Sequence, residues 1–347
     1  MSFRIRRRAL ATVVPVTMLA LAGCASSGES SEEQGPQTLR IGALGNATDT
    51  LNPLTTQGYG DYVAVGHLYG VLVRLVDGVA TIDLAESIEP DEAAIRWTIT
   101  LREGLTFSDG APITSTDVAY SLELLADPET STSYSGFFVD VQADAIEIVD
   151  DRTLVVPLAR PRGDFVTTVL AFASFVLQEG AAENWQTPVS SGAYTLDEYA
   201  PGERITLDAR EDLGADNPEI ARLEVLIIND PQARMTALQS GELDVATRID
   251  PVMAQTIEAN DALEVFRGGE GDSQALGFEM NVEYAPFDNP DVRLAMRLAI
   301  DRQALVDTIL LGEGFVGNDL IGQGLVGYDT SIEQREHDPE RAATLFA

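Results

Sequence analysis

The segment from Ile95 to Pro128 constrains the fold more than any other part of the sequence. Residues 95–102 alternate between apolar and polar side chains, and this period of two is typical of a β-strand buried on one face. Leu105 and Phe107 predict a second short strand, because the Glu-Gly pair before them can turn the chain. The segment is therefore expected to begin with two half-buried strands.

The second half of this segment predicts an amphipathic helix. Thr114 is suited to the N-cap position, and Asp117 places a negative charge near the helix N-terminus, where it is favourable. Apolar residues then recur at helical spacing until Pro128 ends the helix. These apolar positions are Val118, Leu122 and Leu125. A strand followed by such a helix indicates an α/β layer.

Three motifs resemble those of a known family. Trp97 to Leu122 reads W-T-x-T-L-R-x-G-L-x-F-S-D-G-x-P-I-T-x-x-D-V-x-Y-S-L, Ala237 to Asp244 reads A-L-x-x-G-E-x-D, and residues 286–302 read P-F-D-N-P-D-V-R-x-A-M-x-x-A-I-D-R. These motifs closely resemble segments of the family 5 bacterial extracellular solute-binding proteins, the peptide-binding and sometimes nickel-binding receptors of ABC importers. The resemblance implies an α/β fold of the type II periplasmic-binding-protein class, with two lobes and a subdomain inserted in lobe I.

The resemblance also implies a domain layout. Lobe I is expected at residues 38–272, with the inserted subdomain near 54–185, and lobe II is expected to start within 273–347. Residues 276–281 are expected to form the strand that crosses between the lobes. Family members continue beyond the motif at 338–345, so the resemblance implies that lobe II is incomplete in this chain.

Turn and cap residues predict further elements. Asp150-Asp151 predicts the turn of a hairpin. Residues 223–227 and 243–246 predict strands joined by a helix that begins at Asp230-Pro231, and such a crossover joins parallel strands. Other helices are expected to begin at Asn289 and Asp301, and residues 338–345 resemble a family helix of the form D-P-x-x-A-x-x-L that begins at Asp338.

The N-terminus has the features of a bacterial lipoprotein signal peptide. Residues 1–23 combine an Arg-rich start with an apolar run that is too short for a comfortable transmembrane helix. The run ends in Leu-Ala-Gly before Cys24, which resembles a lipobox, so Cys24 is expected to be lipidated. Residues 24–37 are polar and predict a flexible tether. The expected location is the extracytoplasmic face of the cell membrane, with the choice between the general and twin-arginine export routes left open.

The charge balance disfavours several classes of partner and activity. The 347 residues contain 22 Lys and Arg against 56 Asp and Glu, a net charge of −34, and every basic side chain is Arg. Such a polyanionic surface repels nucleic acid, so no nucleic-acid partner is expected. The sequence has one Cys and two His, which leaves few groups for nucleophilic catalysis or metal binding. We therefore expect no enzyme activity, no cofactor and no bound metal, and we interpret His67 as a helix-face residue.

Candidate ligand contacts follow from the expected fold. In two-lobe receptors the ligand meets loops at the carboxyl ends of strands and the segments that cross between lobes. Core packing remains the alternative for the aromatic candidates. The candidates are Asn46, Thr48, Tyr59, Phe137, Phe138, Ser190, Ser191, Gly192, Gly277, Phe278 and Asn281.

Together, the resemblance, the lipobox and the tether predict a membrane-anchored receptor. It would act as a monomer, capture a peptide or similar small solute between two lobes, and deliver it to the transmembrane permease subunits of an ABC importer. The alternatives are a receptor for nickel or another solute, a non-transporting truncated paralogue, and a hydrolase that uses paired carboxylates. A carboxylate pair in an apolar cleft, with one pKa strongly raised, would favour the hydrolase.

Overall fold

The computed structural model describes residues 37–56, 58–76, 78–131, 133–269, 276–319, 322–324 and 328–347. Cys24, the predicted signal peptide and most of the predicted tether lie outside the described residues. Within those ranges, no helix is both long enough and apolar enough to cross a bilayer.

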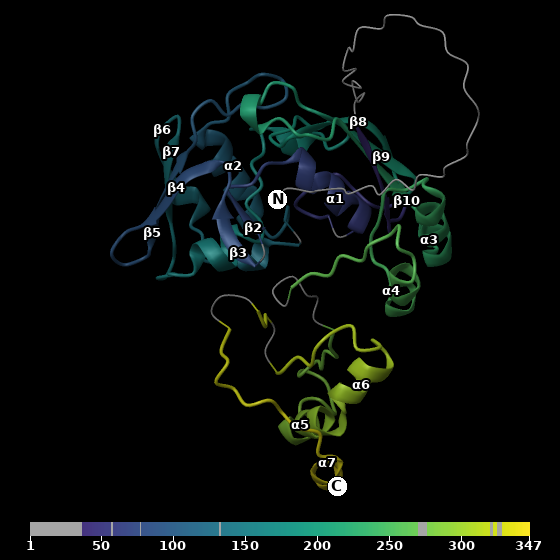
Figure 1. The fold of residues 1–347 in the computed structure, drawn as a ribbon. Helices are drawn as coiled ribbons and strands as arrows, with labels where there is room; N and C mark the ends of the chain where they lie inside the picture. Colours follow the sequence, from purple (N-terminus) through teal and green to yellow (C-terminus); the bar gives the residue numbers. More distant parts are fainter. Residues whose placement is uncertain are drawn as a thin grey trace, which may run out of the picture. The chain divides into compact units, whose positions relative to one another are not determined.

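One mixed sheet unites strands that are far apart in the sequence (Figure 1). Its order is β11-β1-β10-β9-β8, and β1 is parallel to both β10 and β11. Ile41 lies opposite Val225, which lies opposite Ile205, so three distant segments meet in one buried row. The strands are β1 (Thr38–Ala43), β8 (Tyr194–Ala200), β9 (Arg204–Ala209), β10 (Arg222–Ile227) and β11 (Val245–Ala246).

The residues between β1 and β8 form two further sheets. A four-stranded antiparallel sheet has the order β4-β5-β7-β6, and a hairpin pairs β2 with β3. The strands are β2 (Val73–Val76), β3 (Val79–Ile82), β4 (Ala85–Pro90), β5 (Arg96–Leu101), β6 (Glu147–Asp150) and β7 (Thr153–Pro157). The alternating pattern of residues 95–102 thus predicted β5 correctly, and the predicted hairpin turn joins β6 to β7.

The short strand predicted at Leu105 and Phe107 is absent. Phe107 N–H donates to the Ala111 carbonyl, and Ile113 N–H donates to the Leu105 carbonyl. The chain therefore closes on itself around Gly110, whose φ of 86° suits a tight turn. Because these backbone groups are satisfied inside the turn, they do not pair with a neighbouring strand.

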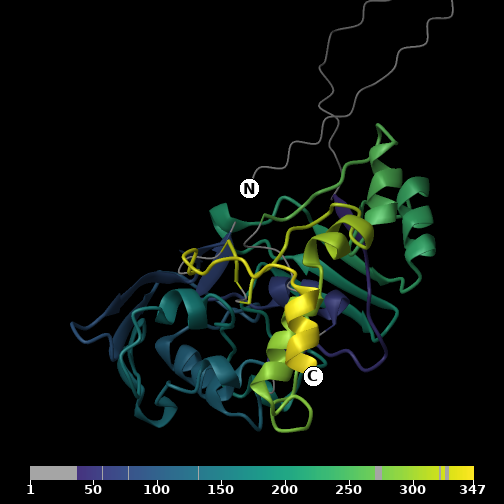
Figure 2. The same ribbon diagram turned by 90° about the horizontal axis from the view of Figure 1, so that it is seen from below.

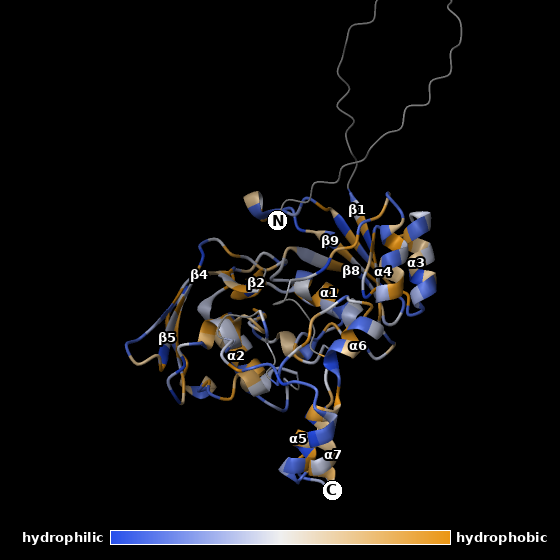
Figure 3. Ribbon diagram, turned by 60° about the horizontal axis from the view of Figure 1, so that its bottom comes forward, coloured by the Kyte–Doolittle hydropathy of each residue, from blue (hydrophilic) through white to orange (hydrophobic). Residues whose placement is uncertain are grey.

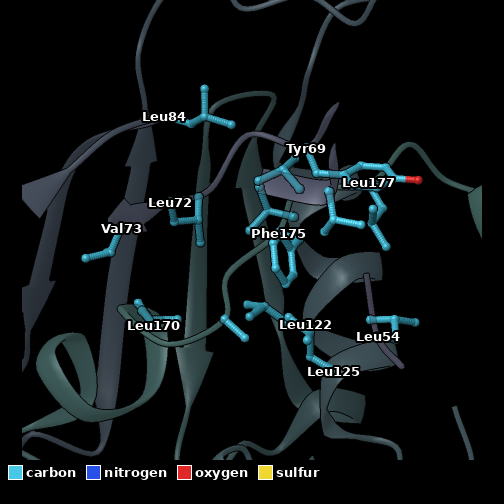
Figure 4. Packing of buried hydrophobic residues seen from close by; sticks show 14 of the residues in the cluster. Leu54, Tyr69, Leu72, Val73, Leu84, Leu122, Leu125, Leu170, Phe175 and Leu177 are labelled. Atoms are coloured by element: carbon cyan, nitrogen blue, oxygen red, sulfur yellow. The ribbon is translucent and has the colours of Figure 1, made fainter. Parts of the chain in front are cut away.

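The helix predicted after this turn is present as α2 (Ser115–Ala126). Thr114 N–H donates to the Asp117 carboxylate over 2.8 Å, which satisfies a backbone donor at the helix start. The predicted apolar face is buried, with Leu122 only 1% exposed. Leu122 and Leu125 belong to the same buried cluster as Leu54 and Phe175 (Figure 4).

The predicted crossover from β10 to β11 is also present. Its helix, α3 (Pro231–Ser240), is capped by the Asp230 carboxylate, which accepts from Ala233 N–H over 2.7 Å. The helix ends at Gly241, where φ is 79°. Strands β10 and β11 lie on either side of β1 and parallel to it. Helix α4 (Pro251–Glu258) follows and lies beside α3 (Figures 1 and 2).

The described residues of 276–347 include three capped helices. Helix α5 (Pro290–Ala299) packs against α7 (Pro339–Phe346), and both carry hydrophobic and hydrophilic residues (Figure 3). Helix α6 (Arg302–Thr308) lies between them in sequence. The caps are the predicted residues Asn289, Asp301 and Asp338.

Residues 276–281 do not form the predicted crossing strand. They carry no regular secondary structure, and Leu276 and Phe278 are 76% and 78% exposed. An extended segment becomes a strand only when a neighbour pairs with its backbone groups. No strand within the described residues pairs with this segment.

Short helical turns complete the described structure. They cover Ser135–Phe137, Ala143–Ala145, Val166–Leu170, Ala181–Glu183 and Gly214–Asp216. Helix α1 (Tyr59–Leu68) follows β1 and contacts β8, β9 and β10 of the mixed sheet.

Candidate functional site

The carboxyl ends of β1, β10 and β11 meet at one edge of the mixed sheet, because these strands are parallel. Asn229, which follows β10, ties two of the loops together. Its side-chain amide donates to the Gly45 carbonyl over 2.8 Å, and its amide oxygen accepts from Gly45 N–H over 3.1 Å. Thr247, after β11, donates its N–H to the Gly42 carbonyl of β1 over 3.0 Å. We call the loops that follow β1, β10 and β11, together with the first turn of α1, the strand-end edge.

Asn46 and Thr48 lie at the strand-end edge, as their positions after β1 predicted. Both are exposed, and their side chains form hydrogen bonds within their own turn. The Asn46 amide oxygen accepts from Thr48 N–H over 2.9 Å, and Asp49 accepts from Asn46 N–H over 2.7 Å. These contacts shape the loop that leads to α1.

A buried arginine holds the loops after β10 and β11 together. Arg234 of α3 is 2% exposed, and its guanidinium donates to the carbonyls of Ile228, Thr247 and Arg248 at distances of 2.6, 3.1 and 3.1 Å. Burial lowers the pKa of Arg234. Arg234 was not among the residues predicted from the sequence. The available signal was its position four residues before the apolar residue Leu238, since residues spaced by four lie on the same face of a helix.

Tyr59 and Arg248 come together at the same edge. The guanidinium carbon of Arg248 lies 4.3 Å from the centroid of the Tyr59 ring, which is cation–π geometry. Arg248 has a φ of 55°, in the left-handed region that non-glycine residues seldom adopt. Such strained residues cluster at binding and active sites. Tyr59 was among the predicted contacts, whereas Arg248 was not.

A buried carboxylate joins the loop after β1 to α1. Asp61 is 2% exposed and accepts from Thr50 N–H over 2.6 Å. Burial, together with the neighbouring charge of Asp49, raises the pKa of Asp61 to about 7. A carboxylate pair with one raised pKa is what the hydrolase alternative requires. However, Asp61 is enclosed and bonded to backbone, so it is placed to hold the loop and not to meet a substrate.

An open pocket of about 240 Å³ lies beside the second half of α1. Tyr62 and Phe172 contribute exposed rings, 52% and 39% exposed, and Phe137 stacks on Phe172 with ring centroids 5.2 Å apart. Gly66 leaves space on the α1 side of the pocket, because a Cβ placed on it would meet no atom within 4 Å. The lining residues are Tyr62, Val65, Gly66, Val71, Val73, Arg74, Leu75 and Ala171 to Phe175. We call this cavity the aromatic pocket.

The two adjacent phenylalanines among the predicted contacts have different environments. Phe138 is 1% exposed and belongs to the hydrophobic core, so core packing applies to it. Phe137 is 40% exposed and supports the Phe172 wall of the aromatic pocket. His67, interpreted as a helix-face residue, lies on α1 with its ring edge-on to Tyr194 at 5.3 Å.

Ser190, Ser191 and Gly192 form an internal junction. Ser190 is fully buried, and its hydroxyl lies within hydrogen-bond distance of the carbonyls of Leu68 and Tyr194, to one of which it donates its single proton. The Ser191 hydroxyl accepts from Gly70 N–H. A Cβ on Gly192 would lie 2.2 Å from the His67 carbonyl oxygen, so only glycine fits this approach. The geometry gives these three residues a structural role in holding the end of α1.

The remaining candidates lie in the irregular segment before α5. Gly277, Phe278 and Asn281 are exposed, and the Asn281 amide oxygen accepts from Glu283 N–H over 3.0 Å. Their role in ligand contact stays a prediction. No group of three or more His, Cys, Asp or Glu side chains arranged to hold a metal ion occurs among the described residues.

Comparisons with known proteins place these features in context. The sequence profile of the bacterial extracellular solute-binding proteins, family 5 (middle region), matches residues 80–347. The oligopeptide-binding protein OppA of Bacillus subtilis (strain 168) is 23% identical, over 94% of this chain and 65% of its own length. This chain therefore spans about two thirds of that relative.

Solved structures show the same fold. AgaA of A. tumefaciens R10, in complex with agropinic acid, aligns with a TM-score of 0.75 and 26% identity, covering 89% of this chain and 63% of AgaA. NikZ of Campylobacter jejuni, in complex with Ni(L-His), aligns with a TM-score of 0.75 and 23% identity, covering 89% of this chain and 62% of NikZ. These matches confirm the predicted α/β fold of the type II periplasmic-binding-protein class. OppA and the probable D,D-dipeptide-binding protein DdpA of Escherichia coli (strain K12) are named as binding proteins, in line with the expectation that the chain is not an enzyme. The chain belongs to the family 5 bacterial extracellular solute-binding proteins.

Proposed function

We propose that this protein is the solute receptor of an ABC importer and that it captures peptides at the strand-end edge and the aromatic pocket. Two observations carry the proposal: three parallel strand ends converge near the start of α1, and the same helix lines a cavity of about 240 Å³ further along its length. Ligands of open α/β sheets bind outside the carboxyl ends of the strands. The likeness to OppA supports a peptide as the solute.

Peptide capture is tested by calorimetry with a library of short peptides. The Tyr59→Ala variant removes the ring under Arg248 and is expected to weaken binding about tenfold, the loss of about 1.4 kcal/mol that one aromatic contact supplies. Tyr120→Ala is the matched control, because it removes a tyrosine ring from α2, outside the strand-end edge. The Tyr120 hydroxyl accepts a hydrogen bond from Ala182 N–H. Unchanged affinity of the Tyr59 variant would remove the strand-end edge from the binding site.

The proposal includes a lipid anchor at Cys24, from which the tether would hold the receptor near the permease. Its support is the order of an Arg-rich start, an apolar run and Leu-Ala-Gly-Cys. The Cys24→Ala variant is expected to move from the membrane fraction to the soluble extracytoplasmic fraction. Membrane retention of that variant at the wild-type level would refute the anchor.

A further inference from the structure

The floor of the aromatic pocket has polar groups that already bond to one another. Val71 and Phe175 form an antiparallel bridge, and Leu72 N–H donates to the Ser174 carbonyl over 3.0 Å. The Ser174 hydroxyl accepts from Val73 N–H over 3.1 Å. Because these groups are satisfied inside the protein, the floor offers a ligand apolar surface in place of hydrogen bonds.

Aromatic rings form the walls of the pocket. Tyr62 and Phe172 contribute exposed rings, and Phe137 stacks on Phe172 with an angle of 8° between the ring planes. Behind the floor, Tyr134 lies edge-on to Phe175 with ring centroids 6.0 Å apart. The pocket volume of about 240 Å³ exceeds the roughly 150 Å³ of an apolar cavity that holds benzene. The pocket therefore has the size and the contact surfaces for one further ring.

The charge at the border of the pocket is balanced within the protein. Of the described residues that line the pocket, Arg74 is the one with a charged side chain. The Asp83 carboxylate accepts from Arg74 Nη2 over 2.6 Å and from Arg74 Nε over 3.1 Å. Asp83 is held in position because its N–H donates to the Leu72 carbonyl over 2.9 Å. Burial lowers the pKa of His67, and Arg74 lowers it further, so His67 is neutral at pH 7.

This arrangement disfavours charged ligand groups of either sign. A cationic side chain would meet the like charge of Arg74, and an anionic one would have to displace Asp83 from Arg74. Either charge would also lose hydration against the apolar walls, whereas a neutral ring avoids both costs. We propose, resting on the proposed peptide function, that the aromatic pocket binds one uncharged aromatic side chain of the peptide and that the Arg74–Asp83 pair sets this selection.

The test uses calorimetry with four kinds of tetrapeptide: all-Ala, and three in which one Ala is replaced by Phe, Glu or Lys. Each replacement is made at all four positions in turn, and the tightest-binding peptide of each kind is compared. The wild-type protein is expected to bind the Phe peptide about tenfold more tightly than the all-Ala peptide, because a ring is buried. The Glu and Lys peptides are expected to bind no more tightly than the all-Ala peptide.

Two variants test the role of the Arg74–Asp83 pair. Asp83→Asn keeps the shape of the side chain but removes its charge, so Arg74 can attract an acidic side chain of the ligand. The ratio of Glu-peptide to all-Ala affinity is expected to rise about fivefold, the size of a partly exposed ion pair. The double variant Arg74→Gln with Asp83→Asn removes both charges and is expected to restore the wild-type ratio.

A third variant tests the pocket itself. Gly66→Leu fills the space beside α1 and is expected to bring the ratio of Phe-peptide to all-Ala affinity close to one. Folding is expected to tolerate this change, because leucine favours a helix more than glycine does. Gly66→Ala fills less of the space and is expected to give an intermediate ratio.

Matched controls are Asp216→Asn and Gly163→Leu, at positions that do not line the pocket. Asp216 pairs with Arg102 over 3.2 Å, and a Cβ on Gly163 also meets no atom within 4 Å. Both controls are expected to keep the wild-type ratios.

The outcomes separate this inference from the proposed function. Equal wild-type binding of the Phe and all-Ala peptides, or tighter binding of the Glu or Lys peptide than of the Phe peptide, would overturn the inference while leaving peptide capture in place. An unchanged Glu-to-Ala ratio in Asp83→Asn would overturn the role of the Arg74–Asp83 pair. Absence of wild-type binding for all the peptides would overturn the inference and the proposed peptide function together.

Discussion

Residues 37–269 and residues 276–347 bury their apolar side chains to very different extents. The first region contains a continuous hydrophobic core in which Phe107 and Leu122 are 0% and 1% exposed. The second has a small cluster, Ala295, Leu298 and Ala342, formed where α5 meets α7. Ile309, which is not part of this cluster, is 67% exposed.

This difference bears on where stability resides. Apolar burial is the dominant favourable contribution to folding, so the first region supplies most of the free energy of unfolding of the described residues. The second region has correct local helices with caps, but few buried contacts hold them. It is therefore expected to open at lower cost than the first.

The largest expected change in the free energy of unfolding comes from creating a cavity in the first region. Leu122→Ala removes a fully buried side chain from α2 and is expected to lower the free energy of unfolding by about 3 kcal/mol. Ile309→Ala, at an exposed position of the second region, is the control and is expected to change it by less than about 0.5 kcal/mol. Urea titration measures both, and equal losses would remove the contrast between the regions.

A smaller effect is expected from the buried carboxylate of α1. The folded-state pKa of Asp61 is raised to about 7, above the unfolded value of about 3.9, so the folded protein holds a proton that the unfolded chain releases. The stabilisation by protonated Asp61 is full below the unfolded pKa and is lost as pH rises through about 7.

The Asp61→Asn variant isolates this contribution. Its amide oxygen can still accept from Thr50 N–H, but the side chain does not ionise. The stability of the variant relative to wild type is expected to rise by about 2 kcal/mol between pH 5 and pH 8. Paired urea titrations across this pH range measure the difference, and a constant difference would show that Asp61 keeps an ordinary pKa.

The smallest effect is expected in the second region. Leu298→Ala weakens the contact between α5 and α7 and is expected to cost about 1 kcal/mol locally, because few neighbours lose contact. Hydrogen exchange is expected to accelerate in α5 and α7 while β1 and β10 stay unchanged. Leu305→Ala, at a 44% exposed position of α6, is the control. Faster exchange throughout the mixed sheet would show that the two regions unfold as one unit.

Local signals were sufficient for many of the elements. Asp230, Asn289 and Asp338 each cap a helix whose first residue is Pro, as the sequence predicted. Capping depends on atoms within three residues of the cap, so no distant contact is needed. The alternation of residues 95–102 was likewise sufficient for β5, because one face of that strand is buried.

Pairing between distant segments was harder to predict. The family resemblance predicted a strand at residues 276–281, yet a strand requires a partner for its backbone. Phe137 and Phe138 are neighbours in sequence, and only the packing around them buries one ring and exposes the other. In the candidate site, the sequence indicated Tyr59 through its position, whereas the contact with Arg248 requires the 188 residues between them to fold back.

The sequence by itself determined the family resemblance, the class of fold and the starts of the capped helices, because these depend on residue order and on short-range hydrogen bonds. The tertiary structure alone decided that Arg234 supports the loop of Arg248 and that Gly66 opens the aromatic pocket. The physical reason is that such contacts arise only when the parallel strands bring their carboxyl ends to one edge.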